Sequence, residues 1–206
     1  MSDIAKKISR YFEQRQELYP GDFFEKPSVS IFQTTPDKHP QPEIQTKQPE
    51  NNENTLITSG NPQAQVIFIC TRPLKQDIES KKLISGEAGV LFDKILKAID
   101  LSREDVYITP LRFVSHSGKL SEKSEVEIID KLIDGNKPKV LVSLGDNAGN
   151  EILGQNYKID DVHGQIFQYK NVPLVYSYHP ELVRRNDQLK RPIWEDFKII
   201  RDVISK

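Results

Sequence analysis

From residue 66 onward the chain alternates between short apolar runs and amphipathic helical patterns, and this alternation restricts the available folds more than any other feature. Four runs rich in β-branched and aromatic residues are typical of buried parallel strands, and they occupy residues 66–70, 106–109, 140–144 and 174–178. Between them, apolar residues recur at helical spacing at 89–99 and 124–133, and Pro192 is predicted to open a last helix. The alternation predicts a three-layer α/β/α sandwich with a central parallel sheet.

The first 54 residues differ in character from the rest of the chain. Within residues 1–25, apolar residues recur at i+4 behind a capping Ser or Asp, which predicts an N-terminal helix. Residues 26–54 are rich in Pro, Gln, Glu, Asn and Lys and cannot bury enough apolar area to offset the entropy lost on ordering, so we predict a disordered linker. The folded domain is expected at 55–206. The helix either packs on that domain or binds a protein partner, because a flexible linker permits both.

Charge and cysteine content limit the classes of function. The chain has 29 Lys and Arg against 30 Asp and Glu, a formal net charge of -1, so any nucleic-acid surface must be a local patch. The 1 Cys excludes an intrachain disulfide and suits a reducing compartment, and no apolar run approaches the ~20 residues needed to cross a bilayer. We therefore predict a cytoplasmic protein that does not enter membranes.

The segments that follow the four predicted strands form the candidate site, because ligands of such sheets gather at the carboxyl ends of the strands. The last of these segments is the most informative. From Ser177 the chain reads Ser-Tyr-His-Pro-Glu-Leu-Val-Arg-Arg-Asn, and from Leu189 it reads Leu-Lys-Arg-Pro-Ile-Trp-Glu-Asp-Phe-Lys. These residues resemble the C-terminal signature of the family-4 uracil-DNA glycosylases.

Further motifs of that family occur in the same order. Asn61-Pro-Gln-Ala-Gln-Val-Ile-Phe-Ile is similar to the approach to the family's first motif, and Gly86-Glu-Ala-Gly-Val-Leu-Phe is similar to the helix that follows it. The pairs Leu144-Gly145, Leu153-Gly154 and His163-Gly164 complete the series. Several collinear motifs are a far more specific signal than one His-Pro. The resemblance covers residues 56–206 and implies the α/β fold of the uracil-DNA glycosylases.

The resemblance also implies a mechanism and a set of site residues. Such enzymes flip a nucleotide out of the duplex, because the glycosidic bond cannot be reached in the stack. His179 matches the donor that stabilises the charge developing on the departing base, although a His at a strand end can equally be structural. The loop 179–191 matches the DNA-facing loop, unless its cations are an ordinary solvated face. The implied DNA contacts are Gly145, Asn147, Ser177, Arg184, Arg185, Lys190 and Arg191.

The implied base-binding pocket departs from the family pattern. The family's first motif, Gly-Glu-Ala-Pro-Gly, corresponds to Cys70, Thr71, Arg72, Pro73 and Leu74. Thr71 thus stands where the family has a water-positioning Glu, and it can orient a water through its hydroxyl without supplying negative charge. Ile84 replaces the aromatic that stacks on uracil, a contact worth ~1–3 kcal/mol per base in single-strand binders. Pro110 replaces the Asn that reads the base, and it has no amide side chain or backbone N–H.

Two residues of the altered motif have alternative interpretations. Arg72 either reaches a phosphate or pairs with Asp77. Cys70 ends an apolar run and is interpreted as a small buried hydrophobe, not as a nucleophile. The family's four cluster cysteines are missing, so an iron–sulfur cluster cannot be ligated in the usual way, and we predict neither a cofactor nor a metal.

Two hypotheses of function follow. The first is a DNA-repair glycosylase that removes uracil or another damaged base through His179 and a water oriented by Thr71, with Cys70, Arg72, Pro73, Ile84 and Pro110 around the base. The second is a non-catalytic DNA- or protein-binding member of the superfamily with a degenerate active site. The two differ in whether Thr71, Ile84 and Pro110 line one cavity with His179.

Overall fold

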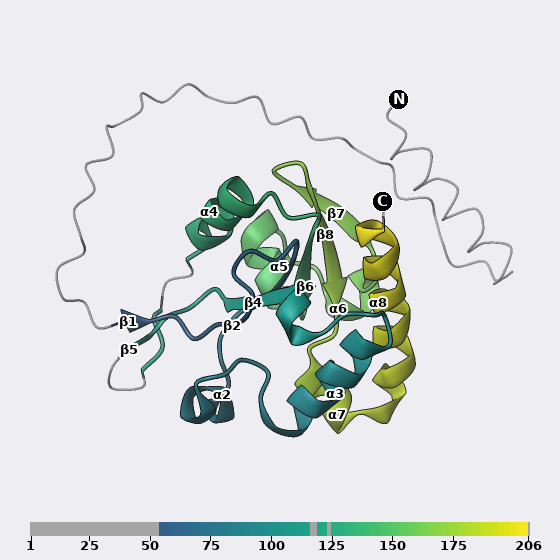
Figure 1. Ribbon diagram of the computed structural model, residues 1–206, viewed down its shortest axis with the longest axis horizontal. Coiled ribbons are helices and arrows are strands. Elements are labelled where there is room, and N and C mark those ends of the chain that lie inside the picture. Colours follow the sequence, from purple (N-terminus) through teal and green to yellow (C-terminus); the bar gives the residue numbers. More distant parts are fainter. Residues whose placement is uncertain (1–53, 116–118, 123–124, 206) are drawn as a thin grey trace, which may run out of the picture. The chain divides into compact units, whose positions relative to one another are not determined.

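The computed structural model describes residues 54–115, 119–122 and 125–205 (Figure 1). The predicted N-terminal helix (1–25) and the predicted linker (26–54), apart from Asn54, lie outside these residues. Both therefore stay predictions. Among the described residues, no helix is both long enough and apolar enough to cross a membrane.

The centre of the domain is a six-stranded sheet with the strand order β2-β4-β3-β6-β8-β7. Its strands are β2 (Ser59–Gly60), β3 (Val66–Cys70), β4 (Val106–Pro110), β6 (Val140–Leu144), β7 (Ile166–Tyr169) and β8 (Val172–Ser177). The four central strands are parallel, which confirms the predicted α/β fold with a central parallel sheet. The edge strands β2 and β7 are antiparallel to their neighbours and were not predicted. A separate two-stranded sheet pairs β1 (Asn54–Thr55) with β5 (Val114–Ser115).

Alternation along the strands divides the core into two layers. Val66, Phe68 and Cys70 of β3 point into one hydrophobic cluster, whereas Ile67 and Ile69 point into the other, because successive side chains leave a strand on opposite faces. The first cluster is covered by α3 (Gly86–Lys97), α7 (Pro180–Arg185) and α8 (Lys190–Ile204), which lie together in Figure 1. The second is covered by α4 (Glu127–Asn136) and α5 (Asp146–Leu153).

Three aromatic rings fill the centre of the first layer. Phe68, Phe92 and Phe197 are each fully buried, and their ring centroids lie 5.1 to 6.1 Å apart. These spacings fall in the range that aromatic pairs prefer. Because the three rings come from β3, α3 and α8, they join the first central strand to the last helix.

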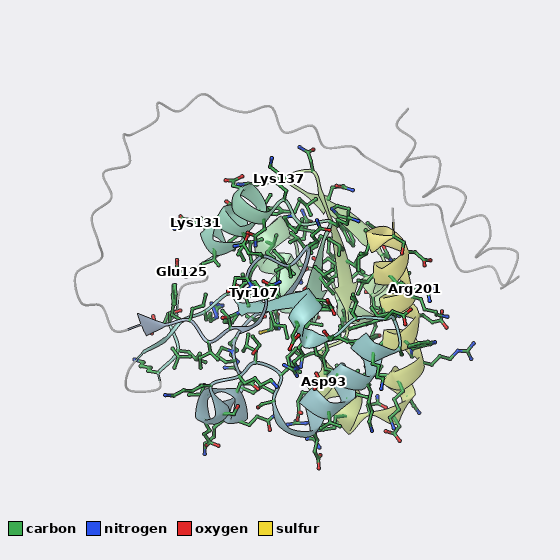
Figure 2. The ribbon with its side chains drawn as sticks, viewed as in Figure 1. Asp93, Tyr107, Glu125, Lys131, Lys137 and Arg201 are labelled. Atoms are coloured by element: carbon green, nitrogen blue, oxygen red, sulfur yellow. The ribbon has the colours of Figure 1, made fainter. Side chains whose placement is uncertain are left out.

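The predicted helix boundaries need correction by a few residues. α3 begins at Gly86 and α4 at Glu127, three residues away from the predicted starts in each case. α8 begins at Lys190, so Pro192 lies inside the first turn, where its missing N–H costs no hydrogen bond. Several charged side chains on the helices are exposed (Figure 2). Examples are Lys131 on α4, Lys137 directly after α4, and Arg201 on α8.

Among the described residues, four helices and two 3-10 turns were not predicted. They are α2 (Lys75–Ser80), α5, α6 (Ile159–Val162), α7, η1 (Arg103–Asp105) and η2 (Asp187–Leu189). The segment 179–191, expected as a loop, is thus α7, η2 and the first residues of α8. It is helical because Pro180 stands at the first helical position and the His179 side chain caps the helix.

Candidate strand-end site

The carboxyl ends of the parallel strands meet at one edge of the sheet. Cys70 and Pro110 are direct partners in the β3–β4 register, and the Leu111 N–H donates to the Cys70 carbonyl at 2.9 Å. On the other side of β6, the Gly145 N–H donates to the Ser177 carbonyl at 2.8 Å. We call the predicted pocket residues at this edge, Cys70 to Pro73, Ile84, Pro110 and His179, the strand-end site.

His179 is held as a neutral hydrogen-bond donor. It is half-buried at the N-cap of α7, and its Nδ1 accepts the Glu181 backbone N–H at 3.1 Å. Burial lowers the pKa of His179, and the negative charges of Asp77 and Glu181 oppose this only in part. Because Nδ1 accepts, the neutral ring carries its proton on Nε2, and this N–H can donate to a group bound in the site.

The segment from the end of β3 to Pro73 is buried at both ends and exposed to solvent in the middle. Cys70 is 2% exposed, and burial, followed by the charge of Asp77, raises the pKa of its thiol to about 12. A buried thiol of this kind is not a nucleophile at neutral pH. Thr71 is half-buried, the side chain of Arg72 is exposed, and Pro73 is buried. Thr71 and Arg72 are therefore accessible to a ligand, and we call these two residues the lip of the site.

The Asp77 carboxylate accepts hydrogen bonds from backbone N–H groups and a hydroxyl, and not from Arg72. Its Oδ2 accepts from the Leu74 N–H at 3.0 Å, and its Oδ1 accepts from both the N–H and the hydroxyl of Ser85 at 2.8 Å. The carboxylate is 2% exposed. Of the two alternatives for Arg72, pairing with Asp77 is therefore the one that the structure does not form.

Ile84 has a strained backbone and belongs to the core. Its φ is 50°, in the left-handed region that a β-branched residue rarely adopts, and it is 1% exposed. Arg103 holds this conformation, because its guanidinium donates to the Leu83 carbonyl at 2.8 Å and to the Ile84 carbonyl at 2.6 Å. Asp93 accepts from the same guanidinium at 2.5 Å. Ile84 packs in the same hydrophobic cluster as Cys70.

Pro110 is the last residue of β4 and is buried beside Cys70. An ion pair that sequence reasoning missed lies just beyond it: Arg112 donates to Glu151 of α5 at 2.9 Å. The other carboxylate oxygen of Glu151 is buried and has no hydrogen-bond partner. The sequence signal for this pair was an arginine three residues past a predicted strand, which is too common to be specific.

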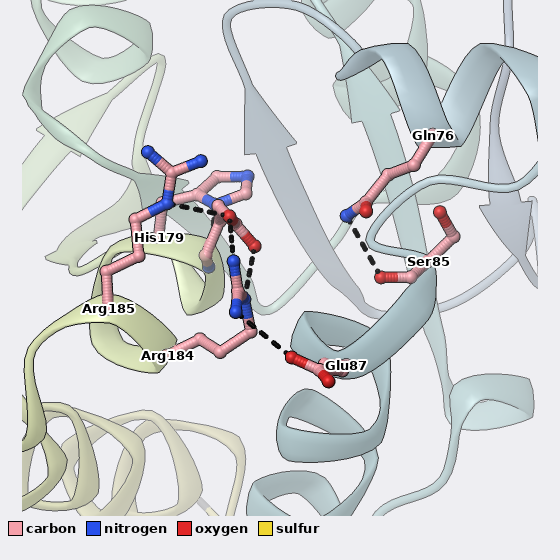
Figure 3. Close-up of polar contacts among 7 residues, drawn as sticks. Gln76, Ser85, Glu87, His179, Arg184 and Arg185 are labelled. Atoms are coloured by element: carbon pink, nitrogen blue, oxygen red, sulfur yellow. Dashed lines mark hydrogen bonds and ion pairs between the residues drawn. The ribbon is translucent and has the colours of Figure 1, made fainter.

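The cations predicted to face DNA are largely paired with acids of their own segment. Arg184 donates twice to Glu181, at 2.8 and 3.0 Å, and once to Glu87 of α3 at 3.0 Å (Figure 3). Arg185 donates to Glu181 at 2.9 Å, and Lys190 pairs with Asp187 at 2.8 Å. The sequence interpretation counted the four cations without these acids, and the helical spacing brings the two kinds together.

Glu181 is the centre of this network. Hydrogen bonds from Arg184, the largest cause, and from Arg185 lower its pKa to about 2 against the opposing effect of burial. Arg185 remains well exposed, with 68% of its side chain accessible, and Arg191 is also exposed. Arg185 of α7 therefore remains accessible at the surface, whereas Arg184 joins α7 to α3.

The three other predicted DNA contacts are placed differently from one another. Asn147 is exposed in the first turn of α5, and Gly145 caps that helix with a φ of 93°. Ser177 is fully buried, and its hydroxyl donates to Asp196 of α8 at 2.9 Å. Asp196 also binds His163 Nδ1 at 2.9 Å. The Ser177 side chain thus anchors the end of β8 to α8 and is not presented at the surface.

The residues do not fit the iron–sulfur cluster of the family-4 enzymes. The chain has 1 Cys, and Cys70 is buried at the end of β3. Within the described ranges, no three His, Cys, Asp or Glu side chains gather as metal ligands. We expect the purified protein to be colourless, with iron at background in elemental analysis. Stoichiometric iron would contradict the count of thiolate ligands.

The fold and the site together define an α/β domain that presents a histidine N–H donor at the carboxyl ends of a parallel sheet. The sequence profile of the uracil DNA glycosylase superfamily matches residues 57–198, and the chain belongs to this superfamily. This confirms the resemblance inferred from the strand-end motifs.

Curated relatives match over most of the chain. A type-4 uracil-DNA glycosylase of Sulfurisphaera tokodaii is 28% identical over 164 residues, which covers 73% of this chain and 74% of the relative. One of Archaeoglobus fulgidus is 29% identical over 161 residues, covering 71% of this chain and 80% of the relative. One of Thermotoga maritima is 24% identical over 172 residues, covering 76% and 86%.

Proposed function

We propose that this protein is a DNA glycosylase that cleaves the N-glycosidic bond of uracil or of another damaged base, as a step of base-excision repair. The observation that carries the proposal is the state of His179. A neutral imidazole with Nδ1 occupied and an Nε2–H available is suited to stabilise negative charge on a departing base. Membership of the superfamily and the type-4 relatives support the choice of reaction.

The other strand-end residues have defined parts in this proposal. A flipped nucleotide enters at the exposed lip, where Arg72 meets a phosphate and the Thr71 hydroxyl orients the attacking water. Cys70, Pro73, Ile84 and Pro110 are buried, so in this proposal they form the closed apolar floor beneath the base and offer it no hydrogen bond. His179 donates to the base as the glycosidic bond breaks, and water then attacks the cationic sugar.

The altered floor predicts low activity toward uracil. Pro110 has no amide to read the base edge, and a site that depends on such hydrogen bonds discriminates by ~10⁴–10⁵. Ile84 removes an aromatic platform and is fixed in the core. A lesion whose departure needs little recognition by hydrogen bonds is the better substrate for such a pocket.

The direct test is incubation of the purified full chain with oligonucleotides carrying uracil, hypoxanthine or xanthine, single-stranded and duplex, followed by alkaline cleavage. Cleavage at a modified base that disappears in His179→Ala supports the proposal. No cleavage of any substrate at enzyme excess would refute it and would leave the second candidate.

The second candidate is a non-catalytic member of the superfamily that binds DNA or a protein. It is favoured by Ile84 and Pro110, which are closed into the core where the family has groups for the base. The protein partner, assigned to the predicted helix at 1–25, and the cytoplasmic location stay predictions.

DNA binding by α7 can be tested with two variants that each remove one partner of the Arg185–Glu181 ion pair. Arg185→Ala removes an exposed cation, so we expect weaker binding and a log-affinity against log-salt slope smaller by about one. Glu181→Gln releases Arg184 and Arg185 from their internal partner, so we expect tighter binding. Fluorescence anisotropy across a salt series measures both. Loss of affinity in both variants would mean that the network acts only by holding the fold.

A further inference from the structure

The most constrained polar group at the strand-end site is Asp77, to which neither the sequence motifs nor the proposed mechanism gives a part. It is the third residue of α2, and its carboxylate closes half of a capping box by accepting the Leu74 N–H. A cap of this kind needs only one oxygen and is normally exposed. Here the second oxygen reaches Ser85, eight residues further along the chain, and the whole group is 2% exposed.

The Ser85 contacts place Asp77 between two walls of the site. Leu74 ends the segment that follows β3, and Ser85 follows the strained Ile84. Gln76, the neighbour of Asp77 on α2, adds a hydrogen bond to the Ser85 carbonyl at 3.3 Å, which Figure 3 shows in the same view as His179. The carboxylate therefore ties the lip after β3 to the wall formed by Ile84.

Asp77 is also a buried charge without a counter-ion. Both of its oxygens accept hydrogen bonds from neutral donors, and no Lys, Arg or His of the described residues forms an ion pair with it. A buried charge left uncompensated acts strongly on its surroundings, because the local dielectric constant is low. Its field reaches both ends of the site, since it raises the pKa of Cys70 and opposes the lowering of the pKa of His179.

The negative charge of Asp77 matters because position 71, where the family has a glutamate, carries an uncharged threonine here. A glycosidic bond that breaks toward a cationic sugar is stabilised by nearby negative charge, and Thr71 supplies none. We propose that Asp77 provides the strand-end site with the buried negative charge that position 71 lacks, and positions Ser85 and Ile84 against the lip after β3. The catalytic part of this inference rests on the proposed glycosylase function, whereas the electrostatic and positioning parts do not.

The test is the titration of His179 by NMR in the full chain, with the His179 signal assigned by its absence in His179→Ala. Asp77→Asn keeps the size of the side chain and removes its charge, so the pKa of His179 should fall further. Loss of packing alone would have the opposite sign, because a loosened site lets water in and relieves the burial that lowers this pKa. An unchanged or raised pKa in a folded Asp77→Asn variant overturns the proposal.

Two further variants complete the design. Glu79→Gln removes one negative charge from the exposed side of the same helix, where Glu79 pairs with Lys75, and should leave the His179 pKa unchanged. Asp77→Glu keeps the charge and should leave it near the wild-type value. If Asp77→Asn does not fold, Asp77→Thr, a neutral side chain of nearly the same volume that leaves no room for water, takes its place and must give the same downward shift.

An activity measurement separates this inference from the proposed function. If the wild type excises a base, Asp77→Asn should lower the single-turnover excision rate at least tenfold while the Kd for DNA stays within twofold. A parallel loss of DNA binding would contradict the catalytic part. If the wild type excises nothing, the glycosylase proposal fails on its own test, and the His179 titration still decides whether Asp77 supplies the charge.

Discussion

Replacing His179 with alanine should lower the excision rate of this protein by about 10²–10³, because one preorganised donor to a developing anion is typically worth that much. The loss should appear in the single-turnover rate and not in the affinity for DNA, since the ring acts on the base as it departs. Single-turnover cleavage and anisotropy binding on the best substrate measure the two quantities.

A second variant separates this role from the structural one. His179 also caps α7 through Nδ1, and loss of an N-cap costs ~0.5–2 kcal/mol of stability. His179→Ser keeps a capping oxygen but cannot reach the base. Equal losses of rate in His179→Ala and His179→Ser would assign the effect to the Nε2–H donor. Retained activity in His179→Ser would show that only the cap matters.

The strands that could be predicted most accurately are those buried at every position. β3 and β6 were placed to the residue, because a central parallel strand is buried on both faces and reads as a nearly continuous apolar run. β7 was missed, since its residues are only half-buried and its pattern is not distinct from a loop. The parallel order followed from the alternation of strands with helices, whereas the antiparallel edges left no signal.

The edge of the sheet where the candidate residues lie could be predicted from sequence, but the contacts among them could not. The resemblance brought His179, Cys70 and Pro110 to one edge of the sheet, and the register places Cys70 beside Pro110. Arg184 pairs with Glu87, 97 residues away in sequence, and no local pattern announces such a contact. The same holds for Arg103, which binds two carbonyls 19 and 20 residues earlier in the chain.

The turn at Ile84 gives the prediction with the largest expected effect on stability. Gly89 of α3 lies so close to this turn that an added Cβ would stand 2.4 Å from the Ile84 carbonyl oxygen and 3.1 Å from Arg103. The nearest atom belongs to the backbone and cannot rotate away. Gly89→Ala must therefore push the Ile84 carbonyl off the guanidinium that holds it, and we expect a loss of about 1–3 kcal/mol, typical of overpacking.

Gly135 of α4 provides the matched control, because an added Cβ there meets no atom within 4 Å. Gly135→Ala should be neutral or stabilising by up to ~1 kcal/mol, since alanine loses less backbone entropy on entering a helix. The same substitution in two helices of one domain is thus expected to change the free energy of unfolding with opposite signs, as measured by urea denaturation. An equal change in the free energy of unfolding for Gly89→Ala and Gly135→Ala would contradict the close contact between α3 and the Ile84 carbonyl. The left-handed conformation of Ile84 would then not be held rigidly by Arg103.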